Sequence, residues 1–592
     1  MCIFTTRPTL AAANGRYSKI AEVFRKPSLK NIRKVGTLNG GLMHEATRDI
    51  TTLPHCAAQA DVIFGSPTRV NCYLNFFPSS SLAPLSASNH GIEGKQKRRL
   101  YEPLVLYKAL NEITHEQGAL KQTEVLNNPV TEEQKYHRFL HSLASVCDRV
   151  KRGKTVTSVA ILDGEEKFTY VFACNQVFDG DLDDTRDFLT TLITRLSGFH
   201  SLTVAEQQSV RDEILEMILA FNTPRIGCYL DALRENIVEC LLHCQQAVGQ
   251  KAEVGKGLGV LSGAIAQTTF SETEDDQYLS HFNSLLQALK SFLTPRTTNY
   301  IQSNATEGRF RDGRSFECWS ELRHTISRLK GYEKIVQHFI NSEKAWPELF
   351  QEFIVVPIES TKPESNPLGR KSESAEAIIG RMCSDPASKE RYLKHAGSLE
   401  WVHLDDRVKN QCTRPSFKPY VHSEILVLEW IMAQSNVVFF HDWRYIGSSK
   451  GACQLCRYYF DATGQHGNIK TRPSHGNLYV NWRFPDIPEL EGSLGRTRRQ
   501  TILNSMMTKI REDAFRTLVE KSSKGKRHDS STQPLTEVLY ASTDVRTDGG
   551  TRDLPDIDEL GESFAKGLSL KSVVNSVAGS DTDDEDGGIL LG

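Results

Sequence analysis

Residues 420–485 read YVHSEILVLEWIMAQSNVVFFHDWRYIGSSKGACQLCRYYFDATGQHGNIKTRPSHGNLYVNWRFP, and the interpretation of the whole chain depends on them. His422 and Glu424 form an H-x-E motif, and Cys453 and Cys456 form a C-x-x-C motif 31 residues after the histidine. Zinc prefers imidazole and thiolate ligands, and a catalytic zinc keeps one position for water. The order of these residues predicts a zinc site with three protein ligands, His422, Cys453 and Cys456, and a free carboxylate beside it.

The residues around the two motifs predict secondary structure that supports this site. The apolar run 423–434 predicts a buried helix, and a second helix is expected to begin at Cys453. Two cysteines three residues apart in a first helical turn point the same way, and the helix dipole there favours thiolates. Strands are expected at 436–440, 445–446 and 477–484.

Neither motif is specific alone, since the chain has 13 cysteines in 592 residues. Two alternatives therefore stay open for the C-x-x-C: a structural zinc knuckle, or a buried pair of helical cysteines. A thioredoxin-type dithiol is disfavoured because no β-α-β pattern surrounds the motif. In the catalytic interpretation, zinc lowers the pKa of a bound water to about 7, and Glu424 takes the water proton and delivers it to the substrate.

Composition limits the class of protein less sharply. The 71 basic and 73 acidic residues balance, so net charge gives no argument for a nucleic-acid partner. No apolar run is long enough for a membrane helix, and the cysteines are scattered, so an intracellular protein, cytoplasmic or nuclear, is expected. The basic N-terminus favours a disordered tail, with a mitochondrial presequence as the alternative.

Changes in pattern along the chain predict five regions. Residues 1–99 are expected to be largely irregular, and residues 522–592 to form a disordered acidic tail. Residues 100–179 predict helices and a β-hairpin, residues 180–395 a helical insertion or helical domain, and residues 396–521 the zinc-binding core.

The predicted hairpin at 155–174 matters because the zinc-binding core is too short to form a sheet by itself. Its two β-rich runs flank Asp163-Gly164, a typical hairpin turn, and a helix at 131–150 precedes it. We expect the hairpin to join the sheet of the core, with the helical block inserted between them. Asn175 follows the second strand. The alternative is that the hairpin belongs to a separate domain and Asn175 is a turn residue.

Several of these residues together resemble a known family. The segments Ile446–Lys450 (IGSSK), Cys453–Cys456 (CQLC) and Arg472–Gly476 (RPSHG), with Trp482, resemble the fungal OTT-like branch of the nucleic-acid and nucleotide deaminase superfamily. The resemblance implies a cytidine-deaminase-like α/β fold, with a mixed sheet and flanking helices, and hydrolytic removal of an amine from a base. Ala452 stands where the wider superfamily has proline. The OTT-like branch also lacks that proline.

The resemblance also points to further site residues. If the hairpin joins the core, Asn175 falls where similar deaminases keep an asparagine that contacts the substrate's sugar or base. His475 is predicted to face the pocket as a proton donor or substrate contact, although a loop histidine that caps its own turn fits as well. Lys450 and Arg472 are predicted to meet a substrate phosphate, with ordinary solvated charges as the alternative. Trp482 and Tyr479 would stack on a base or belong to the core.

The sequence therefore predicts a Zn2+-dependent deaminase, a hydrolase acting on C–N bonds of the amidine type. Its substrate is expected to be a nucleotide or single-stranded nucleic acid, with cytosine as the first choice of base. The helical region would shape access or bind a protein partner, and no membrane partner is expected. The competing prediction is a non-catalytic helical interaction protein that carries a structural zinc module.

Overall fold

A computed structural model of the chain describes residues 94–113, 131–244, 249–267, 275–308, 317–369, 373–462, 464–486 and 492–522. These residues belong to one structural unit, formed by residues 90–270 and 274–592. The predictions for residues 1–93 and for the acidic tail after Ser522 lie outside the described residues. The remaining six residues of the region expected to be irregular, 94–99, begin a helix instead.

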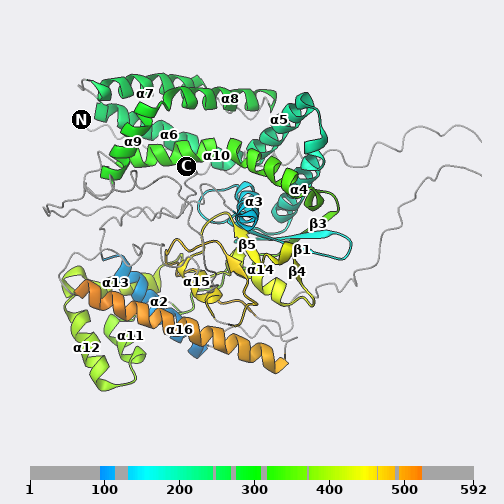
Figure 1. Cartoon of the computed structure of the whole chain (residues 1–592). Coiled ribbons are helices and arrows are strands. Elements are labelled where there is room, and N and C mark those ends of the chain that lie inside the picture. The colour runs from blue at the N-terminus through cyan, green and yellow to red at the C-terminus, as the bar shows by residue number, and fades with distance from the viewer. Residues whose placement is uncertain are drawn as a thin grey trace, which may run out of the picture. The chain divides into compact units, whose positions relative to one another are not determined.

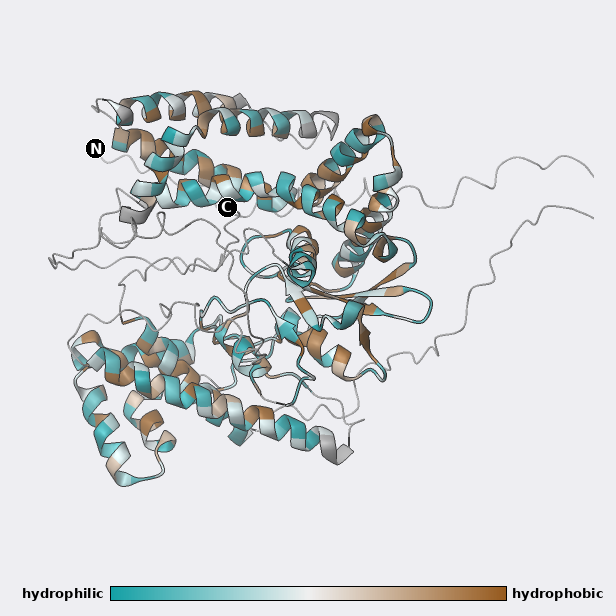
Figure 2. Cartoon of the chain, in the orientation of Figure 1, coloured by the Kyte–Doolittle hydropathy of each residue, from teal (hydrophilic) through white to brown (hydrophobic). Residues whose placement is uncertain are grey.

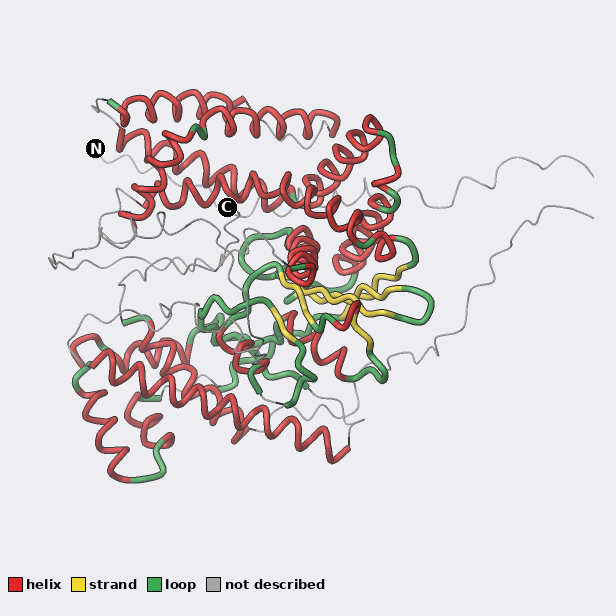
Figure 3. Tube along the Cα trace, viewed as in Figure 1, coloured by secondary structure: helices red, strands yellow, loops and turns green. Residues whose placement is uncertain are grey.

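The centre of the fold is a mixed sheet (Figures 1 and 3). Its strands are β1 (Thr157–Asp163), β2 (Phe168–Cys174), β3 (Phe353–Ile358), β4 (Val438–Phe439), β5 (Tyr445–Ser448) and β6 (Lys470–Thr471). The order is β3-β2-β1-β5-β6, and β4 also pairs with β1. The β1–β2 and β1–β5 pairs are antiparallel, whereas the β2–β3 and β5–β6 pairs are parallel. The predicted α/β class with a mixed sheet is thus confirmed.

The β1–β2 hairpin is the one that the sequence predicts. Its register pairs Asp163 with Phe168, and the turn between them starts at Gly164. A Cβ atom on Gly164 would lie 2.6 Å from the Lys167 carbonyl oxygen, so the turn needs glycine there. Because β1 pairs with β5, the hairpin shares a sheet with the segment that leads to the C-x-x-C motif.

Helices cover both faces of the sheet, and each face has its own core. Alternation along β1 sends Val159 and Ile161 to one core and Ala160 and Leu162 to the other. The first core belongs to α3 (Glu132–Cys147) and the helical block. The second belongs to α14 (Ser423–Met432), α15 (Gln454–Phe460) and the helices packed behind them. Figure 2 shows the apolar residues gathered on the strands and along one stripe of many helices.

The helices on the first face are α3 (Glu132–Cys147), α4 (Gly180–Leu196), α5 (Val204–Phe221), α6 (Thr223–Cys244), α7 (Gln250–Gln267), α8 (Asp275–Phe292), α9 (Pro295–Gly308) and α10 (Glu317–Ala345). Capping boxes at Thr131 and Thr203 begin α3 and α5, as their sequences predict. The chain leaves the sheet after β2, forms α4 to α10, and returns at β3. The parallel strand β3 was not predicted, because its span was interpreted as helical or irregular.

The helices on the second face are α2 (Gly94–Asn111), α11 (Ala375–Met382), α12 (Pro386–Gly397), α13 (Leu404–Thr413), α14 (Ser423–Met432), α15 (Gln454–Phe460) and α16 (Gly492–Ser522). Short 3-10 turns lie at Phe199–Ser201, Pro347–Phe350, Glu400–Val402 and Phe440–Asp442. None of the helices in the described ranges is long and apolar enough to cross a membrane.

The strand predicted at 477–484 does not form. Leu478, Val480, Trp482 and Phe484 are buried in alternation, so the period that predicted a strand is real. The backbone of this segment, however, bonds to the first turn of α15 and to Tyr420 instead of a neighbouring strand. The Gln454 N–H donates to the Asn477 carbonyl, and only an isolated bridge joins Trp482 to Tyr420.

Candidate metal centre

Two helix N-termini bring the predicted zinc ligands together. His422 is the N-cap residue of α14, and Cys453 is the N-cap residue of α15, with Cys456 in the first turn of the same helix. The His422 Nδ1 atom lies 3.6 Å from the Cys453 Sγ atom and 3.4 Å from the Cys456 Sγ atom. The tertiary fold therefore closes the 31-residue gap between the two motifs into direct contact.

The donor set fits a zinc ion. The ligand atoms of His422, Cys453 and Cys456 all lie within 4.8 Å of one another, and all three residues are buried. Within the described ranges, this is the one group of three or more histidine, cysteine or acidic residues close enough to hold a metal. One nitrogen and two sulfur donors are a ligand set that zinc favours, with a further position left for water.

The electrostatics of the two thiols also fit a cation. Burial alone raises the pKa of Cys453, but the hydrogen bond from Cys456 and the nearby His422 bring that pKa well below its usual value. Burial and the negative Cys453 then raise the pKa of Cys456 well above its usual value. The negative charge on Cys453 thus disfavours ionisation of Cys456. A bound divalent cation would allow both thiols to ionise.

Trp482 completes the surroundings of the thiols. Its side chain is fully buried, and its indole N–H donates to the Cys456 Sγ atom at 3.2 Å. Hydrogen bonds of this kind orient a metal ligand and stabilise its negative charge. The suggestion that Trp482 stacks on a base is wrong, because no face of the indole is accessible.

Glu424 points toward the thiol ligands. The residue is 4% exposed, and Cys453 and Cys456 both influence the pKa of its carboxyl group, so the carboxyl lies near the two thiols. The Ser423 hydroxyl also donates to it, at 3.5 Å. Burial raises the pKa of Glu424, with the nearby His422 acting in the opposite direction. A buried carboxyl beside three metal donors is well placed to accept and return a proton.

Asn175 lies next to the H-x-E motif, with its amide bonded to the backbone. The Ser423 N–H donates to the Asn175 Oδ1 atom at 2.8 Å, and the Asn175 Nδ2 atom donates to the Gly153 carbonyl at 2.9 Å. These bonds tie the first turn of α14 to the end of the β1–β2 hairpin. They support a positioning role, and a substrate contact by Asn175 stays a prediction.

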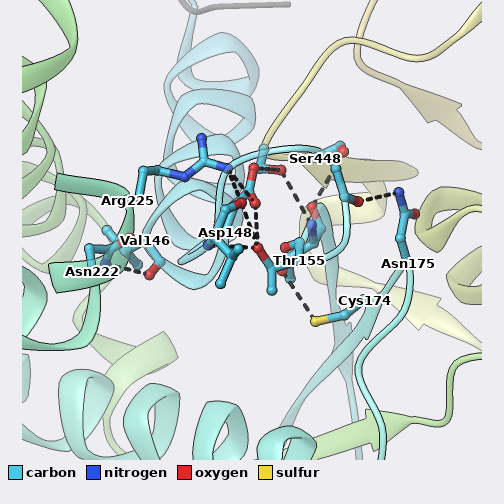
Figure 4. Close-up of polar contacts among 12 residues, drawn as sticks. Val146, Asp148, Thr155, Cys174, Asn175, Asn222, Arg225 and Ser448 are labelled. Carbon is cyan, nitrogen blue, oxygen red and sulfur yellow. Dashed lines mark hydrogen bonds and ion pairs between the residues drawn. The ribbon is translucent and has the colours of Figure 1, made fainter. Parts of the chain in front are cut away.

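A buried polar network connects this region to the helical block (Figure 4). The Arg225 guanidinium on α6 lies 2.7 Å from the Asp148 carboxylate at the end of α3. The same carboxylate accepts hydrogen bonds from the hydroxyls of Thr155, at 2.8 Å, and Ser449, at 3.2 Å. Ser449 lies four residues before Cys453, so the network reaches the approach to the C-x-x-C motif. Neither Asp148 nor Arg225 was singled out by its local sequence.

The RPSHG segment (Arg472–Gly476) lies against the backbone just before Cys453. The His475 N–H donates to the Ala452 carbonyl at 3.1 Å, and the His475 Nδ1 atom accepts from the Asn477 N–H at 3.0 Å. The ring therefore caps its own turn, as the alternative interpretation expected. A proton-donor role for His475 stays a prediction.

The two predicted phosphate ligands differ in their surroundings. The Arg472 Nη1 atom donates to the carbonyls of Ser448, at 3.3 Å, and Ser449, at 3.0 Å. Burial lowers the pKa of Arg472 to about 10. Lys450 is buried in the same loop, at 7% exposure. Contact of either side chain with a substrate phosphate stays a prediction.

Two aromatic residues beside the metal ligands come from different segments. The Tyr420 ring centroid lies 5.3 Å from that of His422, and the Tyr479 centroid lies 6.3 Å from it. Tyr420 was not predicted as a site residue. Its position two residues before the H-x-E histidine was the only local signal.

The comparisons with known proteins agree with the geometry. The model of a family described as OTT_1508_deam-like deaminase matches residues 421–486. No curated protein and no solved structure matches the chain significantly. The matched stretch contains the three clustered ligands and Glu424, so the resemblance seen in the motifs is confirmed for this segment.

Proposed function

We propose that this chain is a zinc-dependent hydrolytic deaminase that acts on a nucleobase in a nucleotide or nucleic acid. The observation that carries the proposal is the buried Glu424 carboxyl two residues after His422, one of three clustered metal donors, inside the segment that matches a deaminase family. A purely structural zinc site has no need of a buried carboxyl group at that point, since its burial costs free energy.

His422, Cys453 and Cys456 would hold the zinc ion. When bound, the zinc would lower the pKa of a water molecule to about 7 and so supply a nucleophile near neutral pH. No fourth histidine, cysteine or acidic ligand joins the group within the described residues, which supports an open position for water. This feature favours the enzyme over the non-catalytic zinc module.

The remaining chemistry belongs to the protein's own side chains. The Glu424 carboxylate accepts one proton of the attacking water and gives it to the ring nitrogen, and it then carries the second proton of that water to the amine, which leaves as ammonia. Asn175 fixes the first turn of α14 and therefore the direction of Glu424. Trp482 stabilises the negative charge on the Cys456 sulfur. Cytosine is the first choice of base, and the cytidine-deaminase-like arrangement of the sheet and the two helix N-termini is part of this proposal.

The test compares the wild-type chain with Glu424→Gln. Both are screened on cytidine, adenosine, guanine, and single-stranded DNA and RNA, with released ammonia or base change as the readout. Glu424→Gln is expected to retain zinc and lose deamination by at least about 100-fold, the range of a general acid–base group. Activity that survives this substitution would falsify the mechanism.

Metal dependence is tested separately with Cys453→Ser. This variant is expected to lose zinc, measured by elemental analysis, whereas Cys383→Ser, which changes a cysteine outside the cluster, is expected to keep it. Equal zinc content in the two variants would remove the C-x-x-C motif from the proposal.

A further inference from the structure

Three elements on the first face of the sheet meet beside β5. Helix α3 packs against β5 and against α10, and Figure 1 shows it between the two. The His141 Nε2 atom on α3 lies 2.8 Å from the Tyr445 hydroxyl on β5. The Ser142 hydroxyl lies 3.1 Å from the His338 Nδ1 atom on α10. These bonds place one face of α3 against one face of α10 and against the strand that leads to the C-x-x-C motif.

Basic side chains lie on α3, on α10 and just after β6 at this junction. Arg138 and His141 are one turn apart on α3, and Lys330, Lys334 and His338 recur every four residues on α10, so each set shares a helix face. Arg328, on another side of α10, acts electrostatically on Arg472, which follows β6. The name "basic cluster" is used here for Arg138, Arg328, Lys330, Lys334 and Arg472.

These cations influence one another. Burial lowers the pKa of His338 to about 4, and Arg138 and Lys334 add to the shift. Burial, then Arg472, likewise lowers the pKa of His141 well below its usual value. Burial is also the main cause of the lowered pKa of Arg472. The Tyr445 phenol raises that pKa, and Arg328 lowers it further.

Three residues of the cluster lack an acidic partner among the described residues. Arg138, Arg328 and Lys330 take part in none of the ion pairs found there, and the Arg328 Nε atom is buried without a hydrogen-bond partner. Glu333, which adjoins Lys334 on α10, is paired with Lys290 at 3.0 Å instead. Half-buried positive charges that lack counter-charges cost free energy, which a bound polyanion would offset.

The cluster reaches the candidate active site through Arg472. Its guanidinium donates to the carbonyls of Ser448 and Ser449, and its own carbonyl accepts from the Ala452 N–H, at 3.4 Å, one residue before Cys453. A mononucleotide presents its phosphates at one point, whereas the cluster extends from α10 across α3 to the end of β6. A chain of phosphates matches such a track better.

We propose that the face formed by α3, α10 and the end of β6 binds the phosphodiester backbone of a single-stranded nucleic acid. The inference rests on the proposed function, because it makes a polymer, rather than a free nucleotide, the substrate whose base enters the metal centre. Binding to the phosphate backbone is expected to be insensitive to base sequence and strongly dependent on salt.

The test uses the full-length chain with the triple variant Arg138→Gln/Arg328→Gln/Lys330→Gln. The matched control is Arg195→Gln/Arg234→Gln/Arg296→Gln, which removes the same charge from exposed positions on α4, α6 and α9. Binding of a fluorescent 20-nucleotide single-stranded RNA or DNA is measured by anisotropy over a range of salt concentrations. Circular dichroism and zinc content establish that each variant is folded.

The triple variant is expected to bind at least about tenfold more weakly, and to reduce the slope of log K against log salt by about 2, since each lost phosphate contact contributes roughly 0.7 for a single strand. The control is expected to bind like the wild type. The charge-conserving Arg138→Lys/Arg328→Lys variant should restore most of the affinity. Equal affinity and equal slope in the wild type and triple variant would overturn the proposal.

The binding assay is independent of catalysis, so the two proposals can fail separately. Deamination of mononucleotides without salt-dependent polymer binding would reject the basic cluster and leave the deaminase in place. Polymer binding that the triple variant weakens, with no deamination of any substrate, would keep the surface and reject the enzyme. If both hold, the triple variant should lower kcat/KM on the polymer and leave that on a mononucleotide unchanged.

Discussion

The buried ion pair between Asp148 and Arg225 leads to a quantitative prediction for Asp148→Asn. The side chains of the two residues are 3% and 7% exposed, and the charged atoms lie 2.7 Å apart. The Arg225 guanidinium also donates to the Val150 carbonyl and the Tyr229 hydroxyl, so the substitution leaves it in place without its counter-charge.

The expected cost follows from that geometry. Removing one partner of a buried pair costs about 3–5 kcal/mol, because the remaining charge stays buried. Asparagine keeps one oxygen for the Thr155 hydroxyl, whereas the Ser449 hydroxyl donates to the other carboxylate oxygen and loses its acceptor, so the full range of about 3–5 kcal/mol is expected. Replacing both partners, as in Asp148→Asn/Arg225→Met, leaves no buried charge and should cost less than Asp148→Asn alone.

The assay is urea denaturation of the full-length chain, followed by tryptophan fluorescence, for the wild type, both single variants and the double variant. Asp183→Asn is the matched control, because its partner Arg186 is a surface neighbour and such pairs contribute about 1 kcal/mol or less. A cost below about 1 kcal/mol for Asp148→Asn, or simple additivity in the cycle, would refute the reasoning. Loss of the Ser449 bond should also weaken zinc binding in Asp148→Asn.

Three further predictions follow from single contacts. Trp482→Phe removes the N–H that donates to the Cys456 sulfur and should weaken zinc affinity about 10- to 100-fold, measured by chelator competition, with unchanged stoichiometry. Gly447→Ala places a Cβ atom 2.4 Å from the Leu140 Cβ atom and should destabilise the fold by about 1–3 kcal/mol in urea denaturation. Burial lowers the pKa of His338 to about 4 from 6.5, so its neutral form should contribute at most about 3 kcal/mol that is present above pH 6.5 and lost as pH falls toward 4, measured by denaturation across that range.

Each of these predictions has a contrasting result. Zinc affinity unchanged in Trp482→Phe would mean that the indole N–H does not support the thiolate. Gly259→Ala is the control for Gly447→Ala, because no atom lies within 4 Å of the added Cβ, and equal effects at the two glycines would contradict the close approach of α3 to β5. His338→Gln should lose part of the acid sensitivity, and an unchanged pH profile would show that His338 is not its source.

Local signals in the sequence were sufficient for the parts of the fold that depend on neighbours along the chain. The Asp163-Gly164 turn, the capping boxes at Thr131 and Thr203, and the helices that begin at the two metal motifs all depend on residues within one or two turns. The spacing of His422, Cys453 and Cys456 named the donor atoms for the same reason, since ligand chemistry is a property of residue type.

Only the tertiary structure decided which distant segments meet. Strand β3 pairs with β2 across the whole helical block, and residues 477–484 alternate in burial without joining a sheet, because strand pairing requires a partner that local periodicity does not specify. The Asp148–Arg225 pair and the contact of Trp482 with Cys456 arise in the same way, from burial that brings polar groups together far from water. The tertiary structure also decided the position of the Glu424 carboxyl. The motif gives only the spacing of Glu424 from His422 along the chain, and the packing of α14 against the sheet brings the carboxyl near the thiols.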